Sequence, residues 1–305
     1  MFDQIISDEV AAAIAERQPI VALETTLVTH GLPQPDGVSV AAALEESVRS
    51  RGAIPATIGV LEGRICVGMS RVELEQLAAT QGVTKLNLSN FAAELASGAS
   101  GSTTVAATMY VAHRVGIPVF ATGGIGGVHR GAAETGDVSA DLIALSRYPV
   151  AVVSAGAKAV LDLPKTVEML ETLGVPVLGY GTDEFPAFYR RQSGLKVDRR
   201  YDDIPSLASA VSAHFDLGFA TGVVIGNPIS AADELPLEIY DRALTDALAD
   251  AAERRVRGRD VTPYLLERMR LLTEGESVAV NQSLLVNNAL LAADLAVELA
   301  RLKSR

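Results

Sequence analysis

Short apolar runs rich in β-branched residues recur along the chain, and most are bounded by glycine or proline. Runs of this length and composition are typical of strands that are buried on both faces of a sheet. The pattern predicts strands over residues 19–24, 54–61, 64–68, 84–89, 117–122, 148–156, 175–180 and 221–227.

Many of the segments between these runs have a helical period instead. Helices are predicted over residues 36–52 and 103–116, both of which end at glycine, and a capping box at Ser70 and Glu73 opens another. Beyond residue 230 the pattern becomes helical, over residues 235–256, 262–275 and 281–302.

Strands that alternate with helices imply a largely parallel sheet covered on both faces. The run at 64–68 follows 54–61 so closely that we expect a hairpin, which adds one antiparallel pair. The fold class is therefore a three-layer α/β/α arrangement with a mixed, mostly parallel central sheet. No linker or repeat divides the 305 residues, so residues 1–305 are expected to form a single domain.

Composition and charge narrow the range of partners. Hydrophobic residues make up 49% of the chain, which is enough for a large core. The formal net charge of -11 repels polyanions, so nucleic acid is not an expected partner and any bound phosphate must meet a local cluster of donors. Cys66 is the only cysteine, which excludes an intrachain disulfide and a cysteine-based zinc cluster.

The N-terminal segment does not have the pattern of a signal peptide. It begins with acidic residues and has no basic leader followed by an apolar core. No apolar run approaches the length that crosses a bilayer, so no membrane partner is expected. These features predict a soluble, cytoplasmic protein.

A glycine-dense segment, ATGGIGGVHRGAAETGDVSADL, lies at residues 121–142. A dinucleotide fingerprint would need a glycine where His129 stands, and the nearby GSTTVAAT lacks the lysine of a Walker A loop. Two interpretations stay open. The glycines either let backbone N–H groups approach an anion or permit a tightly packed turn.

Polar residues follow several predicted strands, where ligands gather in α/β sheets. Glu24 either acts on a ligand or pairs with a buried cation. Lys85 either balances a phosphate or extends into solvent. Lys158 has small and apolar neighbours, so desolvation would favour the neutral amine of a Schiff-base nucleophile; the alternative is a surface lysine in a first helical turn.

Asp137 and Asp141 follow the glycine segment, and Ser139 is a good N-cap for a helix that begins there. One of these aspartates could anchor a hard cation such as Mg²⁺ or Mn²⁺, or both could serve only the helix start. The segment SGASGSTT at residues 97–104 opens a helix, with an anion site and simple capping as its alternatives.

Ten segments together resemble the pseudouridine-5′-phosphate glycosidase family, also described as indigoidine-synthase-A-like. The resemblance runs from about Pro19 to the end of the chain. It is carried by VALETTLVTHGLPQP, GAIPATIGVLEG, GSTTVAATM, VFATGGIGGVHRG, DVSADL, SAGAKAVLDL, GVPVLGYGTDEFPAF, VVIGNPI, TPYLLERM and VNNALLA.

The resemblance implies an activity, a cofactor and an assembly. The implied reaction is the reversible cleavage of pseudouridine 5′-phosphate and water to uracil and ribose 5-phosphate, which places the enzyme with the lyases. The implied cofactor is a divalent metal, typically Mn²⁺, and the implied assembly is a homotrimer. A non-catalytic phosphosugar or nucleotide sensor is the alternative function, and a dinucleotide-dependent oxidoreductase is a third.

Roles carried over by position follow from the resemblance alone. Glu24 corresponds to the proton donor and Lys158 to the nucleophile, while Asp137 corresponds to the metal ligand. The positions that correspond to substrate-binding residues are Lys85, Val105, Thr122, His129, Ser139, Ala140, Asp141 and Asn281.

The implied reaction explains why a lysine takes the place of a second carboxylate. Ordinary glycosidases protonate a heteroatom of the leaving group with one carboxyl group and use another for attack. Here the bond to break joins two carbons, C1′ of ribose and C5 of uracil. A lysine adduct at C1′ supplies the electron sink that this bond requires.

Overall fold

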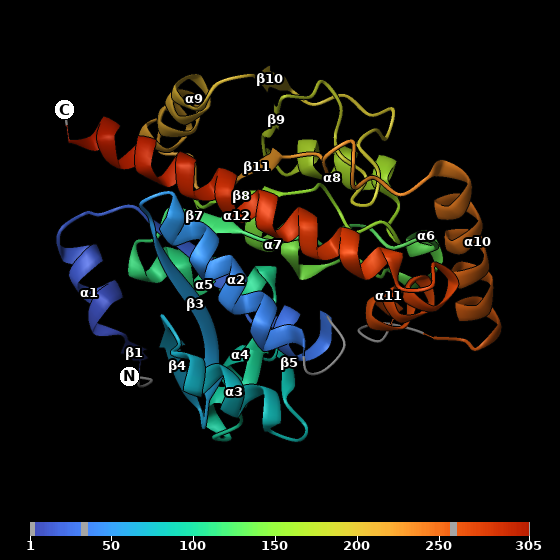
Figure 1. The fold of residues 1–305 in the computed structure, drawn as a ribbon, viewed down its shortest axis with the longest axis horizontal. Coiled ribbons are helices and arrows are strands. Elements are labelled where there is room, and N and C mark those ends of the chain that lie inside the picture. Colours follow the sequence, from blue (N-terminus) through green and yellow to red (C-terminus); the bar gives the residue numbers. More distant parts are fainter. Residues whose placement is uncertain (1–3, 32–35, 257–260, 305) are drawn as a thin grey trace.

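The computed structural model describes residues 4–31, 36–256 and 261–304 and is built around one mixed sheet (Figure 1). Its strands lie in the order β1-β4-β3-β2-β7-β8-β11-β9-β10, and β6 pairs with both β3 and β5. They are β1 (Gln4–Ile6), β2 (Ile20–Glu24), β3 (Ile54–Leu61), β4 (Arg64–Val67), β5 (Thr84–Leu86), β6 (Gly101–Thr103), β7 (Val119–Ala121), β8 (Ala151–Ser154), β9 (Val177–Tyr180), β10 (Arg199–Tyr201) and β11 (Val223–Gly226).

The predicted mixed character of the sheet is confirmed. Among the described strands, β3 runs antiparallel to β4 and to β6, and the other pairs are parallel. Glu62 and Gly63 join β3 to β4 and both have positive φ, at 50° and 74°. Two such residues make the turn whose twist matches an antiparallel hairpin.

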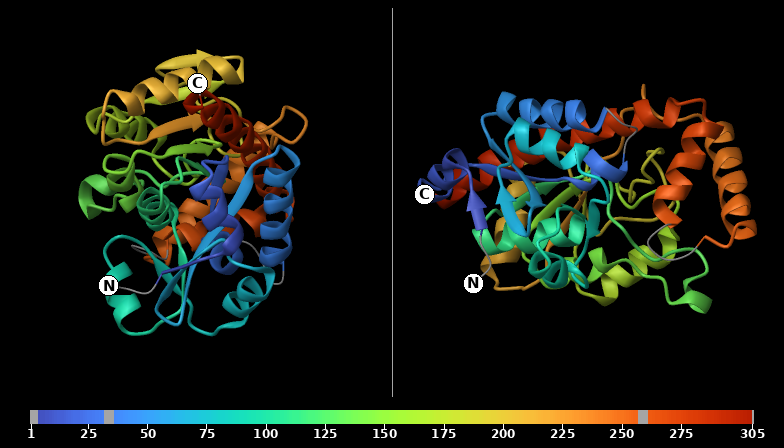
Figure 2. Two further views of the ribbon diagram at one scale, coloured as in Figure 1. Left: turned by 90° about the vertical axis from the view of Figure 1, so that its left-hand side faces the viewer. Right: turned by 90° about the horizontal axis from the view of Figure 1, so that it is seen from below.

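Helices cover both faces of the sheet, as predicted. On one face α12 lies between α2 and α9, and α5 packs with α7 on the other (Figures 1 and 2). The helices are α1 (Asp8–Ala15), α2 (Asp36–Ser50), α3 (Arg71–Ala79), α4 (Phe91–Ala96), α5 (Val105–Val115), α6 (Ala132–Thr135), α7 (Ala140–Leu145), α8 (Leu163–Thr172), α9 (Ile204–Asp216), α10 (Leu237–Glu253), α11 (Val261–Leu272) and α12 (Glu276–Lys303), with a single π-helical turn, η1 (Leu27–Gly31).

The longest helix, α12, is the central helix of one layer. Its 28 residues are apolar enough to cross a membrane by length and composition, yet more than half of its apolar window is buried inside the protein. It contacts α2, α9 and strands β2, β7 and β8. Packing against the sheet therefore explains why the helix is apolar.

Three strands were not predicted, namely β1, β6 and β10. Each has only three residues, and pairing with a neighbour rather than an apolar run defines it. The predicted helix at 103–116 begins later, at Val105, because β6 occupies Gly101–Thr103. The capping box is present, with Ser70 and Glu73 each bonded to the other's backbone N–H.

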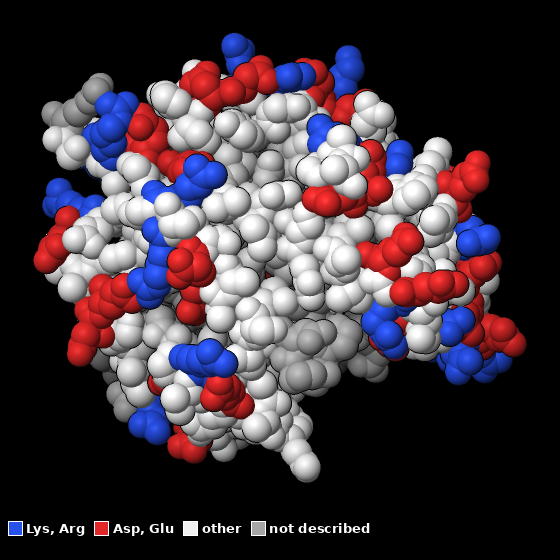
Figure 3. All heavy atoms as spheres, viewed as in Figure 1, with Lys and Arg blue, Asp and Glu red and all other residues white. Residues whose placement is uncertain are grey.

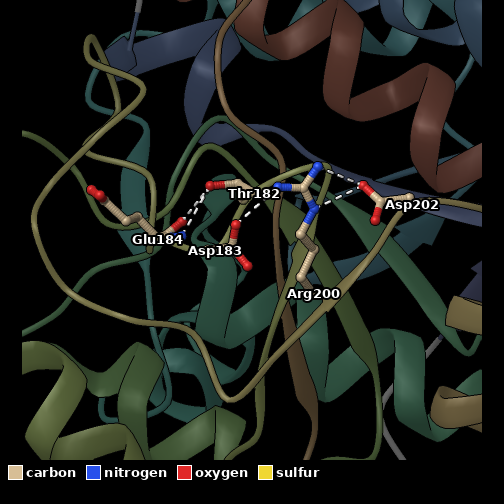
Figure 4. A network of polar contacts seen from close by, with 5 residues as sticks. All are labelled: Thr182, Asp183, Glu184, Arg200 and Asp202. Atoms are coloured by element: carbon tan, nitrogen blue, oxygen red, sulfur yellow. Dashed lines mark hydrogen bonds and ion pairs between the residues drawn. The ribbon is translucent and has the colours of Figure 1, made fainter.

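A long excursion between β9 and β10 reaches back to the carboxyl edge of the sheet. Arg200 bridges its two ends, because its guanidinium contacts Asp183 at 2.9 Å and Asp202 at 2.8 Å (Figure 4). The Thr182 hydroxyl also bonds to the backbone of Glu184. These exposed contacts add little stability individually, but they fix the start and the end of the excursion.

Charged side chains gather around the rim of the face that carries α12. The middle of this face, over α12, is nearly free of Lys, Arg, Asp and Glu (Figure 3). The two charge signs are interspersed on the rim, and no extended basic surface is seen in this view.

A substitution at Gly156 tests how tightly the excursion between β9 and β10 packs on the edge of the sheet. The φ of Gly156 is +82°, and a Cβ there would lie 1.9 Å from the carbonyl oxygen of Pro186. We expect Gly156→Ala to lower the free energy of unfolding by about 3 kcal/mol or more, since strain and overpacking add. Gly174→Ala is the control, because Gly174 has a φ of +68° with no atom near its Cβ position. That variant should lose only about 1–2 kcal/mol in a urea titration. Equal losses would contradict close packing at Gly156.

Candidate active site

A cavity lies at the carboxyl ends of the central parallel strands. Glu24 is the last residue of β2, Thr122 follows β7, and Lys158 lies four residues beyond the end of β8. Because these strands are parallel neighbours, their carboxyl ends meet at one edge of the sheet. The topology thus brings together residues more than 130 positions apart in sequence.

The cavity has two lobes that share five residues: Glu24, Thr26, Lys85, Lys158 and Thr262. One lobe is mostly apolar and the other mostly polar. The apolar lobe is further lined by Leu27, His30, Gly31, Thr122, Gly123, Gly124, Phe188, Pro263, Leu266, Asn281 and Leu285. The polar lobe is further lined by Asn87, Thr104, Gly126, His129, Asp137, Val138, Ser139, Ala140 and Asp141.

Glu24 is a buried carboxyl group at the junction of the lobes. Its exposed fraction is 7%, and the Thr122 hydroxyl donates a hydrogen bond to its Oε1. Burial raises the pKa of Glu24 above its usual range, while the nearby positive charge of Lys158 and the Thr122 hydrogen bond oppose that rise. A carboxyl group that keeps its proton to higher pH is suited to act as a general acid.

Lys158 lies in a loop and not in a helix, so the alternative of a first helical turn is wrong. Its backbone N–H donates to the carbonyl of Ile125 at 3.0 Å, and Ala157 bridges to Ile125 in parallel. The next helix, α8, starts only at Leu163, with Asp162 as its N-cap. The loop holds the lysine against the glycine segment and aims its half-buried side chain at both lobes.

The glycine segment is a tightly packed turn whose N–H groups mostly have protein partners. The N–H groups of Ile125, Gly126, Val128 and His129 donate to Gly156, Asp141, Thr166 and Asp137, respectively. A Cβ at Gly126 would lie 2.2 Å from Ser139 Oγ, and one at Gly127 would lie 2.4 Å from Thr166 Oγ1. Close packing is therefore what these two glycines provide, and four N–H groups of the proposed anion cradle are already used.

Asp141 is a cross-link between three segments. Its Oδ1 accepts from the N–H of Ala106 at 2.9 Å and its Oδ2 from the N–H of Gly126 at 2.7 Å. Asp141 is 5% exposed and sits at the start of α7. Its negative charge is stabilised by the N-terminus of α5, which Thr104 caps. Capping is therefore the alternative observed for SGASGSTT, and a carboxylate of the protein itself binds where the anion site was considered.

His129 and Asp137 face each other across the polar lobe. His129 Nδ1 lies 3.9 Å from Asp137 Oδ2. Burial lowers the pKa of His129, and the negative charge of Asp137 opposes that change. A neutral imidazole beside a carboxylate can both donate and accept hydrogen bonds to sugar or phosphate oxygens.

Asp137 is the residue best suited to hold a hard cation. Among the described residues, no group of three or more His, Cys, Asp or Glu side chains is arranged to bind a metal. Asp141 is committed to two backbone donors. Mg²⁺ and its relatives are often held by a single carboxylate, with waters and substrate oxygens completing the shell, so the donor set fits such an ion.

The remaining residues implied by the resemblance divide into two groups. Lys85, Ser139 and Ala140 line the polar lobe, and Asn281 lines the apolar lobe from α12. Val105 does not line either lobe, because its side chain is buried in the core at the start of α5. Only the backbone of Val105 lies near the polar lobe, because the next residue, Ala106, donates its N–H to Asp141.

Comparison with known proteins supports one family. The family model of the indigoidine synthase A-like proteins matches residues 9–298. The chain belongs to this family. It is 52% identical over 295 residues to the pseudouridine-5′-phosphate glycosidase of Solibacter usitatus, covering 96% of this chain and 98% of that one. It is 48% identical over 297 residues to that of Caldanaerobacter subterraneus, covering 97% of each chain.

Solved structures of two relatives have the same fold. The prealnumycin C-glycosynthase AlnA in complex with ribulose 5-phosphate is 38% identical with a TM-score of 0.92, over 99% of this chain and 98% of that one. An indigoidine synthase A-like protein from Thermotoga maritima is 34% identical with a TM-score of 0.89, over 98% and 97%. The resemblance inferred from sequence segments and the fold class are both confirmed.

Several cavity residues of this family member could not be found from local sequence. Three polar residues line the lobes but belong to no motif that would mark them in the sequence: Thr26, Asn87 and Thr262. Phe188 reaches the apolar lobe from the excursion between β9 and β10 and has a φ of +63°. Such a conformation is unusual for a bulky residue and often marks a functional site, but only the folded structure reveals it.

The buried carboxyl group predicts a pH-dependent stability change in Glu24→Gln. Since the folded-state pKa of Glu24 is raised above 4.5, its stabilising contribution is complete below that pH and is lost as pH rises through the folded pKa. The glutamine variant does not titrate. We therefore expect its stability relative to the parent to increase from about pH 4.5 upward and then to level off. Urea unfolding of both proteins across pH 4–9 measures this, and a pH-independent difference would contradict the burial argument.

Proposed function

We propose that this protein is a pseudouridine-5′-phosphate glycosidase that cleaves the bond between C1′ of ribose and C5 of uracil. The observation that carries the proposal is the placement of a protonatable buried carboxyl group, Glu24, and an amine, Lys158, in one two-lobed cavity. The names of relatives at about 50% identity over nearly the whole chain support the same activity.

The two lobes match the two halves of such a substrate. The apolar lobe, walled by Leu27, Phe188 and Leu285, suits a planar base, and Asn281 offers an amide for its polar edge. The polar lobe suits ribose 5-phosphate, with Lys85, His129 and Ser139 as donors. Side chains contribute to this recognition because the N–H groups of Ile125, Gly126, Val128 and His129 are already bonded within the protein.

The proposed reaction begins with opening of the ribose ring. The neutral amine of Lys158 attacks C1′, the C1′–O4′ bond breaks, and O4′ takes the proton of Glu24. Next, the adduct nitrogen returns its proton to the carboxylate of Glu24. Glu24 passes this proton to C5 of uracil while the freed nitrogen lone pair forms a C=N bond to C1′ and the C1′–C5 bond breaks. Water then hydrolyses the lysine imine, which releases ribose 5-phosphate and restores the amine. The same steps in reverse join uracil to ribose 5-phosphate.

A divalent cation, with Mn²⁺ as the expected ion, is proposed to bind at Asp137. It would offset negative charge on phosphate or sugar oxygens in the polar lobe. We also propose a homotrimer, since the nearly uncharged face over α12 would lose little hydration energy on association. A cytoplasmic location fits the single buried thiol of Cys66.

The function predicts covalent capture of the sugar. Borohydride added with ribose 5-phosphate should attach the reduced sugar to Lys158, which mass spectrometry of peptides locates. Uracil release from pseudouridine 5′-phosphate should fall at least about 10³-fold in Lys158→Ala and about 10²–10⁴-fold in Glu24→Gln. Lys165→Ala is the control, since that exposed lysine pairs with Asp162. If the parent protein releases no uracil, the proposed activity is refuted. If the parent shows no turnover and Lys158→Ala still binds the ligand as the parent does, the sensor function is favoured.

The metal proposal predicts a selective effect of Asp137. Removal of divalent ions with a chelator should reduce turnover, and added Mn²⁺ should restore it. Asp137→Asn should weaken Mn²⁺ binding by about tenfold or more in calorimetry, because it removes the anionic ligand. Asp183→Asn should bind Mn²⁺ like the parent, because Asp183 lies beside Arg200 and lines neither lobe. Equal Mn²⁺ affinity in all three proteins would exclude Asp137 as the ligand.

A further inference from the structure

Asn288 is a fully buried amide in the apolar face of α12. Its exposed fraction is 0%, and Leu284, Leu285, Ala289 and Ala292 around it on the same helix are buried too. Burying an amide costs free energy unless its hydrogen bonds are made inside the protein. The question is therefore what its bonds hold in place.

The Asn288 side chain binds the backbone at the end of β7. Its Nδ2 donates to the carbonyl of Thr122 at 2.8 Å and approaches that of Gly123 at 3.4 Å. Its Oδ1 accepts from Nδ2 of Asn227 at 3.0 Å. A long helix on one face of the sheet is thus bonded directly to the two residues that border the catalytic cavity.

Asn227 extends these bonds to the neighbouring strands. It follows β11, and its backbone N–H donates to the carbonyl of Ser154, the last residue of β8. The N–H of Thr122 in turn donates to Val153, and that of Ala155 to Gly123. The two asparagines therefore tie together the carboxyl ends of β7, β8 and β11, and β8 leads to Lys158.

We propose that Asn288, supported by Asn227, is a positioning residue that fixes the Thr122 peptide so that the Thr122 hydroxyl faces the carboxyl group of Glu24. The inference rests on the proposed function, in which Glu24 is the proton donor. Asn288 lines neither lobe of the cavity. It therefore acts through Thr122, whose hydroxyl donates a hydrogen bond to Glu24.

The bond between Thr122 and Glu24 has a predictable effect on titration. Glu24 also faces the charges of Lys158, Lys85 and Asp141, which stay in place when Asn288 is changed. A hydroxyl that donates to a carboxylate stabilises its charged form. Displacing Thr122 should therefore raise the pKa of Glu24 further, and the alkaline limb of activity, set by loss of that proton, should move to higher pH.

Kinetics of Asn288→Asp and Asn288→Ala, measured on the intact chain with pseudouridine 5′-phosphate, test the inference. We expect kcat to fall about 10- to 100-fold with KM changed less than about threefold, and the alkaline limb to shift upward. Asn287→Ala is the matched control, since the half-buried Asn287 side chain makes no hydrogen bond or ion pair within the described part of the chain. A parent without activity would refute the function itself, whereas an active parent with unchanged Asn288 variants would refute only the positioning role.

A double-mutant cycle separates positioning from general destabilisation. Thr122→Val removes the hydroxyl, so adding Asn288→Ala should lower kcat no further than Thr122→Val alone. Thr122→Ser should keep most activity. The inference would be overturned if the losses of kcat in Thr122→Val and Asn288→Ala add in the double variant. It would also be overturned if kcat falls but the alkaline limb of the pH profile does not shift. If Asn288 variants fail to fold, Asn227→Ser gives the same readouts, because it removes only the support of the Asn288 carbonyl.

Discussion

The burial of one carboxyl group, Glu24, beside the amine of Lys158 is the constraint on which the site depends. Water is kept from the carboxyl group, so the neutral form is favoured and a proton is held ready for transfer. Lys158 opposes that shift through its positive charge, and Thr122 opposes it through a hydrogen bond. The balance requires all three groups at fixed positions, which three adjacent parallel strands provide.

The rest of the cavity edge is organised to keep those strand ends in register. Asp141 bonds the glycine segment to the start of α5, and Lys158 is anchored by its backbone to Ile125. Four backbone donors of the glycine segment, those of Ile125, Gly126, Val128 and His129, are thereby used in cross-links. Side-chain donors add to what remains for phosphate recognition, and Lys85 and His129 line the polar lobe of a chain with net charge -11.

Much of the fold follows from local patterns, whereas only part of the site does. Apolar runs rich in β-branched residues predict the central strands because those strands are buried on both faces, but β1, β6 and β10 depend on pairing. Glu24 and Lys158 could be singled out because parallel strands place their carboxyl ends together. The cross-linking role of Asp141 and the bonds of Asn288 could not, since each depends on partners 15 to 166 positions away.

Two departures from an ideal interior lie at the same edge of the sheet. Phe188 adopts a φ of +63° against Gly124, and the buried Ser154 hydroxyl has no hydrogen-bond partner within the described residues. Each costs on the order of 1–3 kcal/mol. The contiguous apolar core of the other strands and α12 offsets these costs. Such a distribution is expected when a rigid scaffold stabilises a preorganised cavity, because groups fixed before the substrate binds need no reorganisation during bond cleavage.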